Sequence, residues 1–205
     1  MAKLKLTKGE LKKGRDSLAG YERYLPILQL KKQQLQMEII NQLALLVEKK
    51  EKEEEKRRPA EAWAGLLTDK SVDIRPWIVP KNIFTASRNI AGIGITVFER
   101  AEFETDEYDL FSAPLWVDGA IEALKALASL RKEIEIIADG VKVLRNELRV
   151  TTQRVNLFEK VKIPETQEAI RVIRIYIGDQ MANAVGRSKI AKRKIGAALA
   201  EEVSV

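Results

Sequence analysis

The 205-residue sequence contains no cysteine and no histidine. Without cysteine, the chain forms neither disulfides nor thiolate metal sites. Without histidine, it lacks the commonest general base and the commonest metal ligand, so no nucleophile–base pair can be assigned. Neither a G-x-x-x-x-G-K-[ST] loop nor a G-x-G-x-x-G loop for binding phosphate is present. We therefore expect a protein that is not an enzyme by itself and that carries no cofactor and no metal.

Long apolar runs are also missing. None approaches the roughly 20 residues that a helix needs to cross a bilayer, and no signal peptide precedes the first charged residues. We expect a soluble, cytoplasmic protein with no direct membrane insertion. Aromatic residues make up only 6% of the chain and charged residues 32%, a balance that suits long paired helices better than a compact sphere.

The net charge of +6 is unevenly distributed. Residues 1–58 carry 15 Lys and Arg against 9 Asp and Glu, residues 59–120 carry 5 against 10, and residues 121–205 carry 16 against 11. Two basic arms thus flank an acidic middle, which also holds all three tryptophans and has the composition of a small packed unit. Its clustered carboxylates lack EF-hand spacing and indicate an acidic surface, not a cation site: Glu102, Glu104, Asp106, Glu107 and Asp109.

The clearest pattern is a stripe of ten positions spaced 3, 4, 3, 4 in the second arm. A repeat of 3.5 residues is typical of helices that supercoil around each other. Thr151 belongs to this stripe and is small enough for a helix–helix seam. The predicted seam further comprises nine apolar residues: Leu127, Leu130, Ile134, Ile137, Val141, Leu144, Leu148, Val155 and Phe158.

The stripe breaks before Pro164, where we expect a kink or a reset, and resumes shifted. The resumed stripe runs through Ile163, Ile170, Ile173 (or Arg174), Ile177, Met181, Ala184, Ser188, Ala191 and Ile195.

The first arm opens with Thr7-Lys-Gly-Glu10, a capping-box pattern that predicts a helix start. A less regular seam follows from Leu11 to Leu46: Leu11, Gly14, Leu18, Tyr21, Leu25, Leu28, Lys32, Leu35, Ile39, Gln42 and Leu46. A second stripe through Ile40, Leu43 and Val47 predicts a broader buried face. We expect Pro26 to kink or break this helix and Pro59 to mark a change.

In the middle, alternating residues on both sides of Asn89-Ile-Ala-Gly92 predict a β-hairpin. The fold class that follows is all-α: a long antiparallel two-helix coiled-coil hairpin with a small central insertion containing a short β-hairpin. The expected division is 1–58, an N-terminal coiled-coil helix; 59–117, the insertion; and 118–205, a C-terminal coiled-coil helix. Chain order then brings both termini to one end.

Six of the eleven glycines fall at this shared tip, where they would allow close approach of the helices, although a frayed end would look the same. The tip is also basic. A solvated charged end is one interpretation, and a surface that meets an acidic or polyanionic partner is the other. Besides Lys3 and Lys5, the residues that we expect to make this contact are Lys8, Lys12, Lys13, Arg15, Arg187, Lys189, Lys192, Arg193 and Lys194.

Several segments resemble the D subunit of the V-type (A/V-type) ATPases and ATP synthases. They include Asn89-Ile-Ala-Gly-Ile-Gly-Ile-Thr-Val-Phe98, Tyr108-Asp-Leu-Phe-Ser112, Val117-Asp-Gly-Ala-Ile121 and the opening Thr7-Lys-Gly-Glu-Leu11. Arg154-Val-Asn-Leu-Phe-Glu-Lys-Val-Lys-Ile-Pro164 is similar to the family segment R-V-N-x-L-E-x-x-x-I-P. The resemblance covers most of residues 7–177 in order.

The resemblance implies a central-stalk rotor. Its paired terminal helices would enter the ring of A and B subunits, where ATP is made or hydrolysed, and the basic tip would contact that ring. The other end would bind the small F subunit and a collar subunit of the membrane rotor, with the acidic middle as a candidate face for F. Rotation would couple ATP synthesis or hydrolysis to proton or sodium transport.

Two other functions fit parts of the sequence. A nucleic-acid-binding coiled coil would use the basic tip, but its aromatics are not interleaved with the basic clusters, so no nucleic acid is expected. A generic scaffold coiled coil explains the seam but not the acidic, tryptophan-rich middle.

Overall fold

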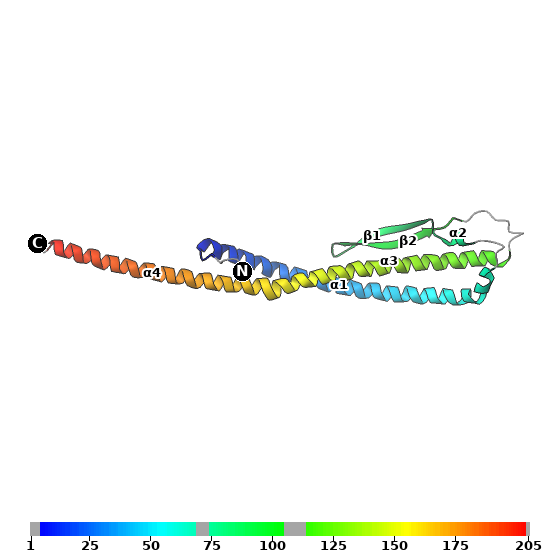
Figure 1. The fold of residues 1–205 in the computed structure, drawn as a ribbon, viewed down its shortest axis with the longest axis horizontal. Coiled ribbons are helices and arrows are strands. Elements are labelled where there is room, and N and C mark those ends of the chain that lie inside the picture. Colours follow the sequence, from blue (N-terminus) through cyan, green and yellow to red (C-terminus); the bar gives the residue numbers. More distant parts are fainter. Residues whose placement is uncertain (1–4, 69–73, 105–113, 204–205) are drawn as a thin grey trace. The chain divides into compact units, whose positions relative to one another are not determined.

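The computed structural model describes residues 5–68, 74–104 and 114–203. A long helix α1 (Lys8–Trp63) is followed by a short 3-10 helix η1 (Ala64–Thr68) and by helix α2 (Arg75–Ile78). Strands β1 (Asn82–Ile90) and β2 (Ile93–Glu102) come next. Helix α3 (Trp116–Leu157), a π-helical segment η2 (Phe158–Lys162) and helix α4 (Ile163–Val203) complete the chain (Figure 1). The predicted fold class, two long helical arms around a small insertion with a β-hairpin, is confirmed.

The chain divides into two compact units. The terminal unit comprises residues 1–29 and 153–205, and the central unit comprises residues 30–152. This division cuts across both helical arms, and the three-part domain division expected from the sequence stays a prediction.

Helix α1 begins where the capping pattern predicts. The hydroxyl of Thr7 accepts a hydrogen bond from the amide of Glu10 at 3.2 Å, and the carbonyl of Thr7 accepts one from the amide of Leu11 at 3.0 Å. The Glu10 carboxylate lies 4.0 Å from the ammonium of Lys13. One half of the predicted box, the threonine cap, is therefore present in the structure.

The two prolines of the first arm do not end helix α1. The helix is unbroken across Pro26 and runs four residues beyond Pro59, to Trp63. A proline removes the hydrogen bond to the carbonyl four residues earlier. At both prolines that carbonyl belongs to an exposed residue, Glu22 or Glu55, so water can bond to it. Of the two outcomes expected at Pro26, a kink or a break, the break does not occur.

The predicted β-hairpin is confirmed, and both of its strands are longer than the alternating runs. β1 and β2 pair antiparallel, with Ile90 opposite Ile93. The two linking residues, Ala91 (φ 51°) and Gly92 (φ 82°), both have positive φ, which matches the right-handed twist of the strands. The side chain of Asn89 accepts a hydrogen bond from the amide of Gly92 at 2.9 Å. This turn brings Ile93 and Ile95 back along β1.

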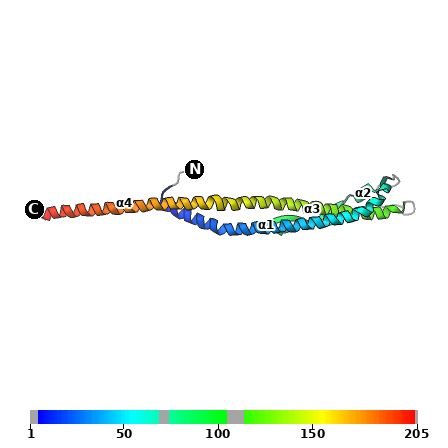
Figure 2. The ribbon, with the colours of Figure 1, turned by 90° about the horizontal axis from the view of Figure 1, so that it is seen from below.

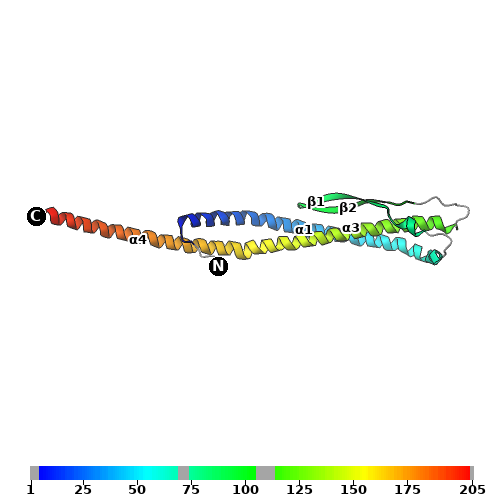
Figure 3. The same ribbon diagram turned by 45° about the horizontal axis from the view of Figure 1, so that its top comes forward.

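Two apolar clusters hold the central unit together. In one, Ile95 of β2 packs with Leu35 and Ile39 of α1 and with Leu144 of α3, so the hairpin covers the α1–α3 pair. Figure 3 shows the hairpin running beside α3. The other cluster joins α2 to the first turns of α3, and all three tryptophans belong to it or pack against it: Trp63, Ile74, Trp77, Trp116, Val117, Ala120 and Ile121.

In the terminal unit, α4 continues past the beginning of α1 (Figure 2). The second arm is longer than the first, because α3, η2 and α4 contain 42, 5 and 41 residues against 56 in α1. Of the predicted shared tip, the structure shows the first turns of α1 beside the part of α4 around Ile170, and α4 extends beyond them. The last part of α4 has no α1 residues left to pair with.

Candidate functional site

The candidate site consists of the seam of the second arm and the basic residues near the chain ends. In the central unit, Leu144 is fully buried, and Ile137, Val141 and Thr151 are buried too. The remaining seam residues of this unit are half-buried, and none is exposed: Leu127, Leu130, Ile134 and Leu148.

Two ion pairs join α1 to α3 beside this seam. The ammonium of Lys31 lies 3.0 Å from the carboxylate of Glu147, and that of Lys49 lies 2.7 Å from Glu133. Residue numbers rise along α1 while they fall along α3, so the two pairs mark an antiparallel register. Both pairs are partly exposed, so each contributes about 0–1 kcal/mol and serves register more than stability.

In the terminal unit, α1 packs against the end of α3, η2 and the beginning of α4. The rings of Tyr21 and Phe158 stack with centroids 5.3 Å apart. Further along, a Cβ added to Gly14 would lie 3.2 Å from Cγ1 of Ile170. Val155, Ile170 and Ile173 are buried on this face. At Gly14 the two helices are close enough that a larger side chain would crowd Ile170, as the sequence suggested for the tip glycines.

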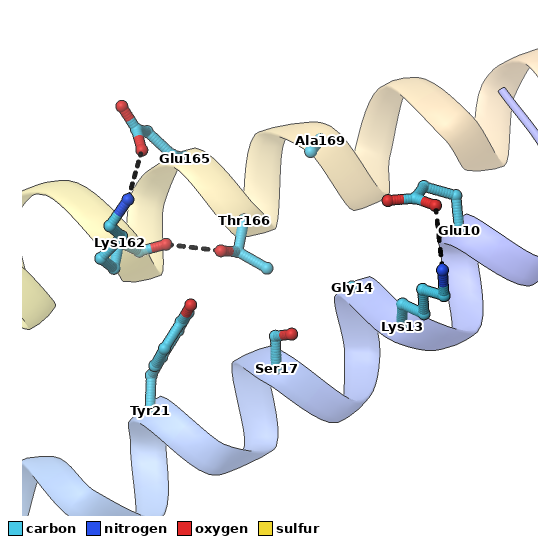
Figure 4. A pocket seen from close by; sticks show the side chains of 9 residues that line it. All are labelled: Glu10, Lys13, Gly14, Ser17, Tyr21, Lys162, Glu165, Thr166 and Ala169. Carbon is cyan, nitrogen blue, oxygen red and sulfur yellow. Dashed lines mark hydrogen bonds and ion pairs between the residues drawn. The ribbon is translucent and has the colours of Figure 1, made fainter. Parts of the chain in front are cut away.

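An open groove lies between these two contacts (Figure 4). It has a volume of about 240 Å³. Its walls carry the polar side chains of Ser17 and Tyr21 from α1, and of Lys162 and Thr166 from the second arm. On either side of the groove α1 contacts the second arm, through Tyr21 on one side and Gly14 on the other.

Beyond Ile177, helix α4 is exposed on every side. All described side chains of residues 178–197, which we call the free end, are exposed. Met181 and Ile195 of the resumed stripe are therefore exposed, so that stripe is not buried beyond Ile177. No neighbouring atom lies within 4 Å of a Cβ built at Gly178, Gly186 or Gly196. The same is true of Gly9 and Gly20, so the expectation that the tip glycines allow close helix approach holds at Gly14 and is wrong for the other five.

All nine candidate ring-contacting residues are exposed. Lys8, Lys12, Lys13 and Arg15 lie on the first turns of α1, opposite the part of α4 that contains Ile170. The other five lie on the free end, about four or more turns further along α4: Arg187, Lys189, Lys192, Arg193 and Lys194. The structure thus separates the basic residues into two groups. Lys3 lies outside the described residues.

Part of one face of α1 that the sequence predicted to be buried is exposed. Ile40 and Val47, predicted to be buried, are 66% and 53% exposed, and Met37 and Leu30 are 67% and 55% exposed. These four residues, spaced 7, 3 and 7, form what we call the outer stripe. The helix α3 and the hairpin cover the face of α1 that carries Leu35 and Ile39, and Leu43 packs against this cluster. The prediction of a broader buried face is therefore wrong for Ile40 and Val47 only.

The acidic residues of the insertion are described only in part. Glu102 pairs with Arg100 at 3.1 Å, and Glu104 pairs with Lys81. Asp106, Glu107 and Asp109 lie outside the described residues, as does the whole segment from Tyr108 to Ser112. Within the part of the chain that the structure describes, no group of three or more His, Cys, Asp or Glu side chains is placed to hold a metal ion. None of the described helices is long and apolar enough to cross a membrane.

Comparison with known proteins agrees with the sequence resemblance. The model of the ATP synthase D-subunit family matches residues 10–193. The V-type ATP synthase D subunit of Borreliella burgdorferi is 43% identical over 195 residues, covering 95% of this chain and 96% of that protein. The proteins of the same name from Chlamydia pneumoniae and Chlamydia muridarum are each 32% identical, covering 94% and 95% of this chain and 93% and 97% of their own lengths.

Proposed function

Because the chain belongs to the ATP synthase D-subunit family, we propose that it is the non-catalytic central-stalk rotor subunit of a V-type ATP synthase or ATPase. In this role it couples ATP synthesis or hydrolysis in the ring of A and B subunits to proton or sodium transport by rotation. The A and B subunits perform the chemistry. The complex sits on the cytoplasmic side of the membrane, and this chain is peripheral to it.

The free end of α4 is the observation that carries this proposal. Among the residues that the structure describes, it has no partner helix, and its residues 180–197 contain five basic residues and no acidic one. A single helix can enter a narrow central opening that a helical pair cannot. Because it presents different side chains to each side, it contacts the surrounding subunits unequally, and only such differential contacts shift their conformational equilibria.

The basic residues of the free end suit a moving contact. Exposed ion pairs contribute about 0–1 kcal/mol each. Several of them can therefore attract an acidic ring surface without holding the rotor at one angle. The apolar side chains of Met181, Val185, Ile190 and Ile195 are also exposed, which gives the same stretch a surface that the A and B subunits can cover.

The test is a variant that ends at residue 177, assembled with the A, B and F subunits. We expect the ring to keep its nucleotide binding and ATP-driven ion transport into vesicles to be lost. A second variant, Lys192→Gln, Arg193→Gln and Lys194→Gln, should weaken coupling in part. The matched control places two Gln substitutions at Lys132 and Lys142 on α3, exposed residues that pair within their own helix. Transport at the normal level without residues 178–205 would contradict the proposal.

The F subunit and the collar subunit are the remaining proposed partners. The outer stripe supports a docked partner, because four large apolar side chains along one helix are otherwise left in water. We assign this stripe to F. Met37→Asp with Ile40→Asp should abolish co-purification of F while leaving the unfolding temperature unchanged. Unchanged binding of F by this variant would contradict the assignment. The site for F would then lie elsewhere, for example on the acidic insertion that the sequence suggested.

The alternative function is a basic coiled-coil scaffold or a nucleic-acid-binding protein. The exposed basic residues of the free end are the observation behind it. Such a protein would bind DNA or RNA tightly at low salt and lose affinity steeply as salt rises. Binding of that kind, together with no co-purification of A and B, would favour this alternative.

A further inference from the structure

The π-helical segment η2 (Phe158–Lys162) interrupts the second arm in the terminal unit. The amide of Ile163 donates to the carbonyl of Phe158, five residues earlier, where an α-helix would use the carbonyl four residues earlier. Such a turn accommodates one residue more than an α-helical turn. Single π turns occur frequently at functional sites.

The extra residue explains why the seam resumes shifted. The face toward α1 carries the buried Val155 before η2 and the half-buried Phe158 at its start, and the 3–4 spacing continues from Ile163 after it. The gap from Phe158 to Ile163 is five residues. In an unbroken α-helix, a residue five positions on points about 140° away from the first. The π turn takes up the additional residue, so the later stripe returns to the side that faces α1: Ile163, Thr166, Ile170, Ile173 and Ile177.

Pro164 favours the wide turn. In an α-helix, its ring would clash with the carbonyl of Lys160, and it has no amide to donate to that carbonyl. Two residues later, the hydroxyl of Thr166 donates to the carbonyl of Lys162 at 2.6 Å. The segment therefore has fewer backbone hydrogen bonds of the ordinary α-helical kind than the helices on either side.

The surroundings of η2 leave it room to twist. The Tyr21–Phe158 stack lies at its start, and the Gly14–Ile170 contact lies two turns after it. Between these contacts is the open groove, which borders Lys162 and Thr166 (Figure 4). The side chains of Glu159, Lys160 and Val161 are exposed. Packing thus holds the second arm at the first residue of the π turn and again two turns after it, whereas the side chains in the middle of the turn are uncovered.

We propose that η2 is a torsional joint, the place between the Tyr21–Phe158 stack and the Gly14–Ile170 contact where the backbone of the second arm twists most readily. It combines a one-residue excess, a proline that disfavours the α-helical turn and an unfilled groove beside it. Its use in a rotor rests on the proposed function, whereas the joint itself is a property of this chain.

Amide hydrogen exchange of the isolated full chain tests the joint directly. The amides of residues 159–166 should exchange at least about tenfold faster than those of residues 150–157 and 168–174. A joint-free variant deletes Val161 and carries Pro164→Ala. The deletion restores the four-residue step from Phe158 to Ile163, so the variant should form an unbroken α-helix whose amides exchange as slowly as their neighbours.

Pro164→Ala alone is the matched control. It removes the proline but keeps the extra residue, so the π turn and its fast exchange should remain, because an α-helical turn would rotate Ile170 and Ile173 out of the seam. Equal exchange of residues 159–166 and the flanking turns in the natural chain would overturn the proposal. So would protection in Pro164→Ala alone equal to that in the joint-free variant. Neither result depends on assembly with A and B, so each is separate from a failure of the rotor proposal.

Discussion

Helix α3 and the free end of α4 carry similar patterns but have different surroundings. On α3, the residues at 3–4 spacing are buried or half-buried against α1, and Leu144 is not exposed at all. On the free end, the same spacing continues through Met181, Ala184 and Ser188 to Ile195, yet Ile195 is 61% exposed. A heptad-like stripe thus identifies which face of a helix can pack. The length of the partner helix decides whether it does within this chain.

The largest difference in the free energy of unfolding is expected between two alanine substitutions, one on α3 and one on the free end of α4. Leu144→Ala should lower the free energy of unfolding by about 2–5 kcal/mol, because it leaves a cavity between α1, α3 and β2. Ile195→Ala on the free end should change it by no more than about 0.5 kcal/mol. Urea unfolding followed by circular dichroism measures both. Equal losses would mean that the free end is packed in the isolated chain.

Two glycines of α1 sharpen the comparison within the terminal unit. Gly14→Leu should destabilise by about 1–3 kcal/mol, because the new side chain meets Ile170. Gly20→Leu is the control: no neighbouring atom lies within 4 Å of a Cβ built there, so it should stabilise by up to about 1 kcal/mol through helix propensity. Thermal unfolding tests this: the unfolding temperature should fall in Gly14→Leu and should not fall in Gly20→Leu. A stabilising Gly14→Leu would contradict the close approach.

The ion pairs between α1 and α3 are expected to matter less. A double-mutant cycle on Lys49 and Glu133 should give a coupling of about 0.5–1 kcal/mol, since both groups are about one-fifth exposed. The comparison pair, Lys132 and Glu135, lies on one helix surface and should give about 0.2–0.5 kcal/mol. A larger coupling for the second pair would show that Lys49 and Glu133 do not contribute to the register of α1 on α3.

The smallest effect concerns a surface pair at the start of α4. Hydrogen bonds from the Arg171 guanidinium, at 2.7 and 2.8 Å, lower the pKa of the Glu168 carboxyl below its ordinary value. A lowered folded-state pKa contributes stability above the unfolded-state pKa, and this contribution is lost as the pH falls through the folded-state pKa. Arg171→Gln should raise the pKa of Glu168 in an NMR titration. An unchanged pKa would contradict the pairing.

Periodicity predicted most of this fold because it records burial directly. The 3–4 stripe on α3, the Thr7 cap and the alternation around Asn89 and Gly92 are local signals, and each matches an element of the structure. Local signals do not specify where the partner helix α1 begins. The sequence therefore predicted that the free end of α4 pairs with the first arm. Nor do local signals show that α3 and the hairpin leave Ile40 and Val47 uncovered.

The π turn could have been predicted from the sequence. Pro164 and the five-residue gap between Phe158 and Ile163 were both visible, and together they imply one extra residue in a helix whose buried face is preserved. We expected either a kink or a reset of the helix at Pro164, and the structure shows the reset. The structure keeps the helix continuous and widens one turn, because burying Ile170 and Ile173 against α1 requires the corrected phase.

The central claim is that this chain rotates within the ring of A and B subunits. The absence of cysteine makes a direct measurement possible, because Thr85→Cys on the exposed part of β1 introduces a single labelling position. A bead attached there, with the ring fixed to a surface, should turn in one direction when ATP is added. It should also lose sustained rotation when residues 178–205 are removed. A bead that stays still in an actively hydrolysing complex with the full-length chain would contradict the account.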